Sequence, residues 1–117
     1  HTQVESVNYG GLSTSPYYEL AKKYATGKPS ALLSFDIKGG FDAGVHFFDS
    51  LKLFKRLVNI GDAKSLVAHP ASTTHRQLSN EELTVAGISK GTLRLCVGIE
   101  HIDDILEDLG QALEKAK

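Results

Sequence analysis

Cysteine is scarce in this sequence of 117 residues, in which Cys96 is the only thiol. One thiol cannot form an internal disulfide, and it cannot build a zinc site from pairs of cysteines either. The stability of the fold must therefore come from the packing of its side chains.

Long apolar runs and an excess of charge of one sign are also lacking. No apolar stretch approaches the roughly 20 residues that a membrane-spanning helix needs, and the first residues lack the basic and apolar regions of a signal peptide. Thirteen basic and fourteen acidic side chains are spread along the chain and give a formal net charge of -1, which leaves no basic stripe for nucleic acid. We therefore expect a cytoplasmic protein that has neither a membrane nor a nucleic acid as partner.

The length fits one domain. A chain with 41% apolar and 23% charged residues is large enough for one hydrophobic core and too short for two. No internal repeat, low-complexity segment or linker divides it, so we expect a single domain over residues 1–117. The sequence opens without a methionine, and residues 4–9 resemble a strand already under way, so we expect it to be cut from a longer protein.

Apolar residues at a spacing of two predict strands over residues 31–37 and 92–97. Between them, a second short strand is expected over residues 64–68, after the turn at Gly61-Asp62, so that the strand over residues 92–97 is the third. In the third of these strands, Arg94 and Cys96 point away from the face that carries the leucines. An irregular loop is expected between the second strand and about residue 78, because the second strand is followed directly by a His-Pro pair.

Apolar residues at helical spacing predict two main helices. The first covers residues 41–58, is expected to be the longest, and carries a stripe formed by Phe47, Leu51, Phe54 and Val58. The second covers residues 101–116, and its stripe, which must cover the sheet, is formed by Ile102, Ile105, Leu106, Leu109 and Leu113.

Capping signals predict two shorter helices. Ser15 and the proline after it favour a helix over residues 16–24. Ser79 with Glu82 three residues later is the signature of a capping box, for a helix that Gly87 ends. Helices and strands thus alternate around one small sheet, which indicates an α/β sandwich domain.

Arg94 is a candidate ligand-binding residue. It is expected in the middle of a strand, with its guanidinium leaving the sheet on the face opposite the leucines. A planar and permanently charged fork is suited to bidentate binding of a carboxylate. The pattern alone, however, favours an arginine that lies over the solvent side of a half-exposed sheet.

Other chemistry has less support. His69 and His75 lack the spacing of metal ligands, so structural hydrogen bonds within their loop are expected. The pair Gly39-Gly40 matches neither a dinucleotide fingerprint nor a Walker motif and indicates a turn. No serine elbow or thiol–imidazole pair marks a nucleophile, and lone acids such as Asp36 are expected to be solvated or to cap helices. We therefore expect neither a catalytic residue nor a metal site in this chain.

Two runs of sequence carry a resemblance to a known family. They are GDAKSLVAHPASTTH over residues 61–75 and LRLCVGIE over residues 93–100. In order and interval they resemble the C-terminal domain of the Cys/Met-metabolism enzymes that depend on pyridoxal 5′-phosphate (PLP), and within that family the O-acetylhomoserine sulfhydrylases. Shorter matches extend the likeness over essentially the whole chain, from Val7-Asn8-Tyr9 to Asp103-Asp104-Ile105.

That resemblance implies a fold-type I PLP enzyme as the parent, which exchanges the acetate of O-acetyl-L-homoserine for sulfide or a thiol and gives homocysteine or methionine. For this chain it implies a small, largely antiparallel sheet covered on one face by helices. The other face would pack toward the parent's own N-terminal catalytic domain. Members of the family are tetramers built from dimers, so the parent is expected to be a homotetramer.

The family's substrate-binding residues fall on matching positions of this sequence. The arginine of the R-L-x-V-G-x-E motif binds the substrate α-carboxylate in relatives and is Arg94 here. Asn59 and Thr74 lie in the same substrate region of relatives, and asparagine is expected in the sulfhydrylases where γ-lyases have serine. Val58 would face the distal part of the pocket, although its place in the apolar stripe slightly favours the core.

The family's cofactor machinery is expected to lie outside this chain. The Schiff-base lysine and the other cofactor-binding residues belong to the N-terminal region of relatives, and no lysine here has the family's Ser-x-Thr-Lys context. We expect no cofactor-binding residue, no PLP absorbance and no turnover from the chain alone. Two alternatives stay open: a methionine or cystathionine γ-lyase as the parent, and a stand-alone module that binds an amino acid for regulation.

Overall fold

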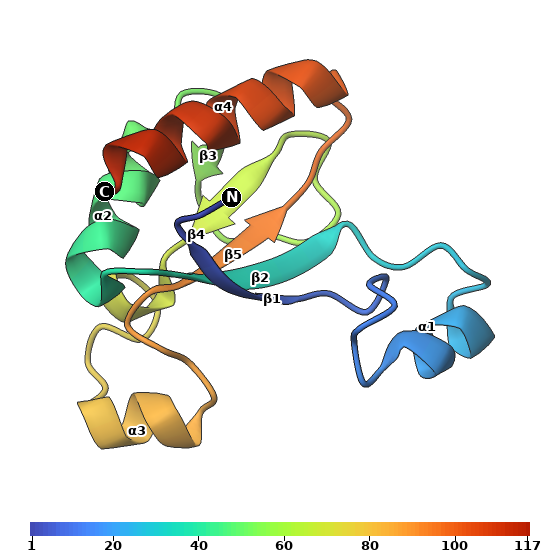
Figure 1. The fold of residues 1–117 in the computed structure, drawn as a ribbon, viewed down its shortest axis with the longest axis horizontal. Coiled ribbons are helices and arrows are strands. Elements are labelled where there is room, and N and C mark those ends of the chain that lie inside the picture. Colours follow the sequence, from blue (N-terminus) through green and yellow to red (C-terminus); the bar gives the residue numbers. More distant parts are fainter.

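The computed structural model describes all 117 residues, and a five-stranded sheet lies at its centre (Figure 1). The strands are β1 (Val4–Asn8), β2 (Leu32–Ile37), β3 (Lys55–Arg56), β4 (Leu66–Ala68) and β5 (Thr92–Cys96). Their order in the sheet is β1-β2-β5-β4-β3. All neighbouring pairs are antiparallel except β3 and β4, which are parallel. The expected, largely antiparallel sheet is confirmed.

The helices occupy two kinds of position. α2 (Gly40–Ser50) and α4 (Ile102–Lys115) lie side by side over one face of the sheet, whereas α1 (Tyr18–Tyr24) and α3 (Asn80–Val85) stand away from it (Figure 1). A short 3-10 helix, η1 (Pro70–Ser72), follows β4. No helix combines the length and the hydropathy that a bilayer span requires.

The core lies between the sheet and the helices α2 and α4. The strand register pairs Phe35 with Leu93 and Leu95 with Val67, so these four side chains share one face. Phe47 of α2 is fully buried and meets the Phe35 ring edge-on, with ring centroids 5.5 Å apart. Burial of one side chain of this size contributes about 1.5–3 kcal/mol. Hydrophobic burial therefore fixes which face of the sheet the two helices cover.

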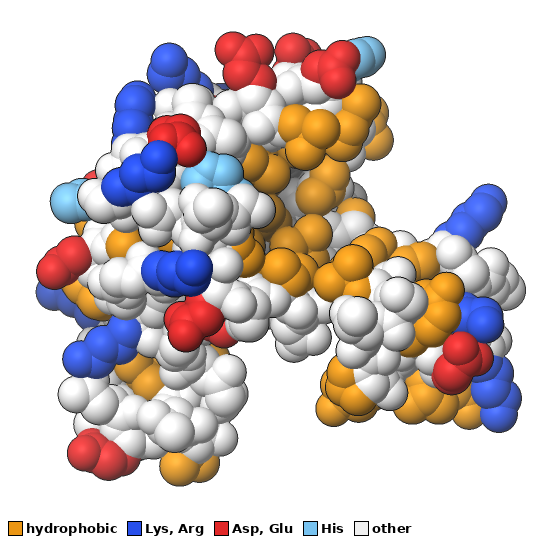
Figure 2. Space-filling view, viewed as in Figure 1, with side chains coloured by type: hydrophobic (Ala, Val, Ile, Leu, Met, Phe, Trp, Pro, Cys, Tyr) orange, Lys and Arg blue, Asp and Glu red, His pale blue; other side chains and the backbone are white.

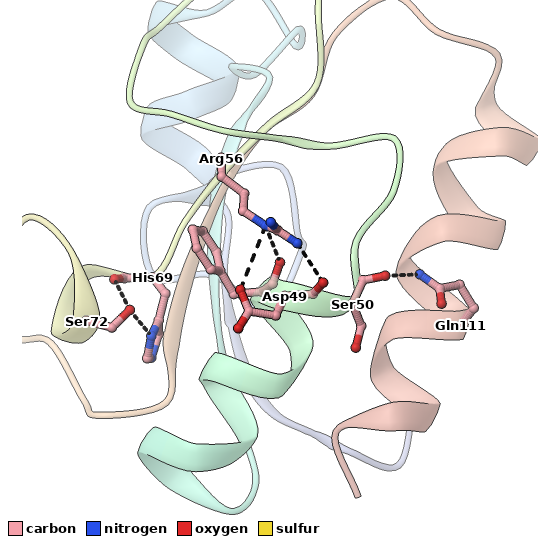
Figure 3. A network of polar contacts seen from close by, with 7 residues as sticks. Asp49, Ser50, Arg56, His69, Ser72 and Gln111 are labelled. Atoms are coloured by element: carbon pink, nitrogen blue, oxygen red, sulfur yellow. Dashed lines mark hydrogen bonds and ion pairs between the residues drawn. The ribbon is translucent and has the colours of Figure 1, made fainter.

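The predicted helix over residues 41–58 is wrong in its second half, because α2 ends at Ser50. Side chains from later segments donate hydrogen bonds to the last carbonyl groups of α2 (Figure 3). Arg56 donates to the carbonyl of Phe48 at 3.0 Å, and Gln111 donates to that of Ser50 at 2.7 Å. The longest helix is consequently α4, with 14 residues against 11 in α2.

A buried carboxylate holds the chain that follows α2. Asp108 of α4 accepts hydrogen bonds from the backbone N–H groups of Lys52, Leu53 and Phe54, at 2.9, 2.8 and 3.2 Å. Burial raises the pKa of Asp108, but these donors outweigh it and hold the pKa below its usual range. A helix that continued past Ser50 would use the same N–H groups for its own bonds. The contact with Asp108 replaces that continuation.

Of the two predicted helix starts, the one at α3 is confirmed and the one at α1 is wrong. At α3 the capping box is confirmed: the Ser79 hydroxyl accepts the Glu82 N–H at 3.3 Å, and the Glu82 carboxylate accepts the Ser79 N–H at 2.7 Å. At α1 the predicted start is wrong by two residues, since the helix begins at Tyr18. The Ser15 hydroxyl accepts the N–H of Tyr17 at 3.2 Å and thus stabilises a turn before the helix.

The apolar stripe of α4 only partly covers the sheet, contrary to the prediction. Ile105 and Leu113 are buried in the core, whereas Ile102 and Leu106 are 57% and 58% exposed. The first turns of the helix therefore present apolar surface to the outside. Figure 2 shows apolar side chains gathered in a hollow beneath this helix.

Candidate functional site

A pocket of about 410 Å³ borders the part of the sheet that carries Arg94. Its lining includes Arg94 of β5, Ser34 of β2, Val58, and the neighbours Thr74 and His75 in the loop after η1. Small-molecule sites have volumes of roughly 300–1,000 Å³, so this space suits a ligand of amino-acid size. The pocket is the candidate functional site.

Arg94 is the charged centre of this pocket. The register places it between Ser34 of β2 and Ala68 of β4, and it is the only Lys, Arg, Asp or Glu in the lining. Its Nη2 donates to the backbone carbonyl of Asn59 at 3.1 Å. It forms no salt bridge with an acidic side chain. Most of its N–H groups are therefore available to an anionic ligand.

Asp36 lies on the same face of the sheet as Arg94, but its carboxylate accepts hydrogen bonds from three hydroxyl groups. Oδ1 accepts hydrogen bonds from Ser89 and Thr92, both at 2.6 Å, and Oδ2 accepts one from Ser6 at 2.8 Å. Burial raises the pKa of Asp36, but the three hydroxyl donors outweigh it and hold the pKa below its usual range. The expectation of a solvated acid is wrong, and Asp36 does not neutralise Arg94.

Asn59 contacts Arg94 through its backbone. Its side chain bonds within its own loop: Nδ2 donates to Asp62 at 3.3 Å, and Oδ1 accepts the N–H of Ile60 at 2.9 Å. Asp62 also accepts the N–H of Lys64 at 3.0 Å, which is the main reason why the pKa of Asp62 lies below its usual range. Asn59 is not among the residues that line the pocket, and it meets Arg94 only through its backbone carbonyl.

Thr74 and Val58 both line the pocket. The Thr74 hydroxyl lies 2.8 Å from Nδ1 of His75. Val58 is 52% exposed, so the slight preference for a core position is wrong. The reason is the end of α2 at Ser50, after which Val58 no longer belongs to the helical stripe.

His69 is a structural residue of the loop beside the pocket. Its ring is completely buried, with Nε2 at 2.8 Å from the carbonyl oxygen of Lys90. Nδ1 lies 2.8 Å from the Ser72 hydroxyl (Figure 3). Because a carbonyl only accepts, Nε2 carries the proton. Burial lowers the pKa of His69, and the bond to Lys90 only partly offsets this. No group of three or more His, Cys, Asp or Glu side chains is placed to hold a metal ion.

Sequence reasoning missed several walls of the pocket. Asn8 and Tyr9 at the end of β1 and Ile88 after α3 also line it, and no local pattern marks them. A signal did exist for Ser34: its strand alternates, and its partner in the antiparallel register is Arg94. The remaining walls depend on how distant segments fold together.

The fold is a small α/β domain with a pocket beside a strand arginine that has no acidic partner. The model of the Cys/Met metabolism PLP-dependent enzymes matches residues 1–114. The chain belongs to this family.

Curated relatives agree with that assignment. O-acetyl-L-homoserine sulfhydrylase of Leptospira meyeri is 54% identical over 115 residues, which are 97% of this chain and 26% of the relative. L-methionine gamma-lyase of Fusobacterium nucleatum subsp. nucleatum is 49% identical and matched over 98% of this chain and 29% of its own length. The chain therefore spans little more than a quarter of these relatives.

Two solved structures show the same fold. A Campylobacter jejuni protein described as an O-acetylhomoserine (thiol)-lyase, with N′-pyridoxyl-lysine-5′-monophosphate, superposes with a TM-score of 0.88 at 47% identity, over 97% of this chain and 27% of that chain. Cystathionine gamma synthase from Xanthomonas oryzae pv. oryzae, in complex with cystathionine, superposes with a TM-score of 0.88 at 41% identity. The match covers 99% of this chain and 30% of that chain. The expected family is confirmed, and its members catalyse different reactions.

The residues of this pocket do not fit the family's cofactor. PLP is held in its enzymes through a Schiff base to a lysine, and no lysine lines the pocket. Cys96, a buried free thiol, is not in the lining either. The arrangement is suited to binding and orienting a carboxylate.

Proposed function

We propose that this chain is the C-terminal, substrate-binding domain of a PLP-dependent enzyme that replaces the acetate of O-acetyl-L-homoserine by sulfide or a thiol. The observation that carries the proposal is Arg94, which borders the pocket and has no acidic partner. A guanidinium with free N–H groups binds a carboxylate through two parallel hydrogen bonds. The identity of 54% to the Leptospira meyeri sulfhydrylase supports the choice of reaction.

Three residues of the pocket lining have a task in this proposal. Arg94 fixes the α-carboxylate, the Thr74 hydroxyl offers a polar contact beside it, and Val58 packs against the carbon chain of the substrate. Anchoring one end of a small substrate orients its other atoms, which is itself a large part of catalysis. The remaining three quarters of the parent would supply the cofactor and complete a homotetramer.

The first test is the intact mass of the protein in its source cells, measured by denaturing mass spectrometry. We expect a species several times heavier than the 12.7 kDa of this chain, with a PLP–lysine adduct. That holoenzyme should form homocysteine from O-acetyl-L-homoserine and sulfide. A cellular species of 12.7 kDa without an adduct contradicts the proposal and favours a stand-alone amino-acid-binding module.

The second test addresses Arg94 in the holoenzyme. Hydrogen bonds to a charged group are worth about 1.5–3 kcal/mol, so Arg94→Ala should raise KM for O-acetyl-L-homoserine roughly 10- to 150-fold. Arg94→Lys should recover part of the loss, because it restores the charge without the fork. Arg76→Ala is the matched control, since this exposed arginine lies outside the pocket lining. A normal KM for Arg94→Ala would contradict carboxylate binding.

A γ-lyase is the second candidate, because L-methionine gamma-lyase of Fusobacterium nucleatum is 49% identical over 98% of this chain. Product analysis separates the two reactions. A sulfhydrylase gives homocysteine only when a sulfur nucleophile is added, whereas a γ-lyase releases ammonia and an oxoacid from methionine alone. Asn59, at the position where the resemblance places serine in lyases, favours the sulfhydrylase.

A further inference from the structure

We infer that Asp62 is a positioning residue for the substrate-binding guanidinium. It holds the peptide of Asn59 so that the Asn59 carbonyl binds one amino group of Arg94 and leaves the other N–H groups to the ligand. The inference rests on the proposed function, because this task exists only if Arg94 binds a substrate carboxylate.

Two hydrogen bonds connect Asp62 with Arg94 through Asn59, and a third ties Asp62 to Lys64. One carboxylate oxygen of Asp62 accepts the backbone N–H of Lys64 at 3.0 Å, and the other accepts Nδ2 of Asn59 at 3.3 Å. The carbonyl of Asn59 in turn accepts Nη2 of Arg94 at 3.1 Å. Asp62 therefore joins the two ends of the loop that carries the contact to Arg94.

The far end of this loop is firmly anchored. Ser65 is completely buried, and its N–H and hydroxyl both donate to the carboxylate of Glu100, at 2.7 and 2.8 Å. The N–H of Ile99 donates to the carbonyl of Ala63 at 3.0 Å. Asp62 transmits this restraint from the anchored end of the loop back to Asn59.

Packing does not fix the near end of the loop. Asn59 is exposed, Ile60 is 69% exposed, and Gly61 has a φ of +75°, a region that glycine enters without strain. Hydrogen bonds, rather than buried surface, therefore decide where the Asn59 carbonyl lies. Without Asp62, the carbonyl would lose its fixed position.

The orientation of Arg94 depends on that carbonyl. Its bond to Asn59 is the only hydrogen bond that the guanidinium makes within the chain, and no salt bridge holds it. An arginine side chain has many rotamers, and a ligand that must order one binds less tightly by roughly 3- to 10-fold. A carbonyl that orders Arg94 in advance removes this loss.

Steady-state kinetics of the holoenzyme test the inference. Asp62→Ala should raise KM for O-acetyl-L-homoserine roughly 3- to 10-fold and leave kcat within about two-fold, because the side chain orders the binding group only. Asp62→Asn keeps one acceptor oxygen and should have a smaller effect. Glu107→Ala removes an exposed carboxylate of α4 that is not part of the pocket lining, and it should change neither KM nor kcat.

A double variant tells positioning from general loosening of the fold. If Asp62 acts through Arg94, adding Asp62→Ala to Arg94→Ala should leave kcat/KM nearly unchanged. A further full drop in kcat/KM, or a normal KM in the single variant, overturns the inference. If Asp62→Ala does not fold, Asp62→Asn with and without Arg94→Ala gives the same comparison.

The two proposals fail in different ways. If the wild-type holoenzyme does not turn over O-acetyl-L-homoserine, or if Arg94→Ala has a normal KM, the proposed function fails and takes the role of Asp62 with it. If Arg94→Ala is impaired while Asp62→Ala is normal, only the role of Asp62 is overturned.

Discussion

The carboxylate of Asp108 in α4 accepts a hydrogen bond of 2.8 Å from the backbone N–H of Leu53, a residue 55 positions earlier in the chain. With the bonds to the N–H groups of Lys52 and Phe54, it holds the segment that follows α2 against α4.

Asp108→Ala should lower the free energy of unfolding by about 2–4 kcal/mol. The substitution leaves three backbone N–H groups without their acceptor, and each unsatisfied buried group is costly. Urea unfolding followed by circular dichroism measures the change. Glu107→Ala, one residue away on an exposed position of the same helix, should stay within about 0.5 kcal/mol of wild type. Equal stability of both variants would contradict the bond.

His69 should make the stability of the chain depend on pH near neutrality. Its folded pKa is lowered by burial, below the unfolded value of about 6.5, so the unfolded chain binds a proton that the folded chain does not. The free energy of unfolding therefore has its full value above about pH 7 and falls as the pH drops from there toward 5. Carboxylates with lowered pKa contribute their own decline only at lower pH.

Urea titrations between pH 5 and 7 check this prediction. His69→Gln removes the titrating group, so its free energy of unfolding should change less over this interval than that of wild type. His46→Gln replaces an exposed histidine of α2 and should retain the wild-type decline. The same slope in wild type and His69→Gln would show that another group is responsible.

Gly44→Ala should destabilise the chain by about 1–3 kcal/mol, although alanine is the better helix former. A Cβ at this position of α2 would lie 2.5 Å from Nε2 of His69, which is itself fixed by Lys90. Gly110→Ala in α4 is the matched control, because its Cβ would meet nothing within 4 Å. That variant should gain about 0.5–1 kcal/mol. Thermal unfolding of the two variants should therefore shift in opposite directions.

Two neighbours on α4 should respond differently to truncation. Ile105 is 4% exposed and belongs to the core, so Ile105→Ala should cost about 2–5 kcal/mol. Leu106 is 58% exposed, so Leu106→Ala should change stability by less than about 0.5 kcal/mol. Chemical denaturation of both variants measures the two changes in the free energy of unfolding. A large loss for Leu106→Ala would mean that its side chain is covered in solution.

The site was predictable to the extent that its residues carry local patterns. Strand alternation placed Arg94 on the face opposite Leu93 and Leu95, as the register confirms. The walls contributed by Tyr9 and Ile88 have no such pattern, because they reach the pocket only after β1 and the segment after α3 come together. The bond from Arg94 to the Asn59 carbonyl was equally unpredictable, because every residue type carries a backbone carbonyl.

The sequence by itself determined the strands around Phe35 and Leu93, the capping box at Ser79 and the family, because alternation, caps and motifs are local properties of the chain. Only the tertiary structure decided where α2 ends, since the apolar spacing continues to Val58 while Asp108 and Arg56 supply competing hydrogen bonds from other elements. Side chains that are distant in sequence satisfy the backbone groups there, and local propensity is too weak to oppose them.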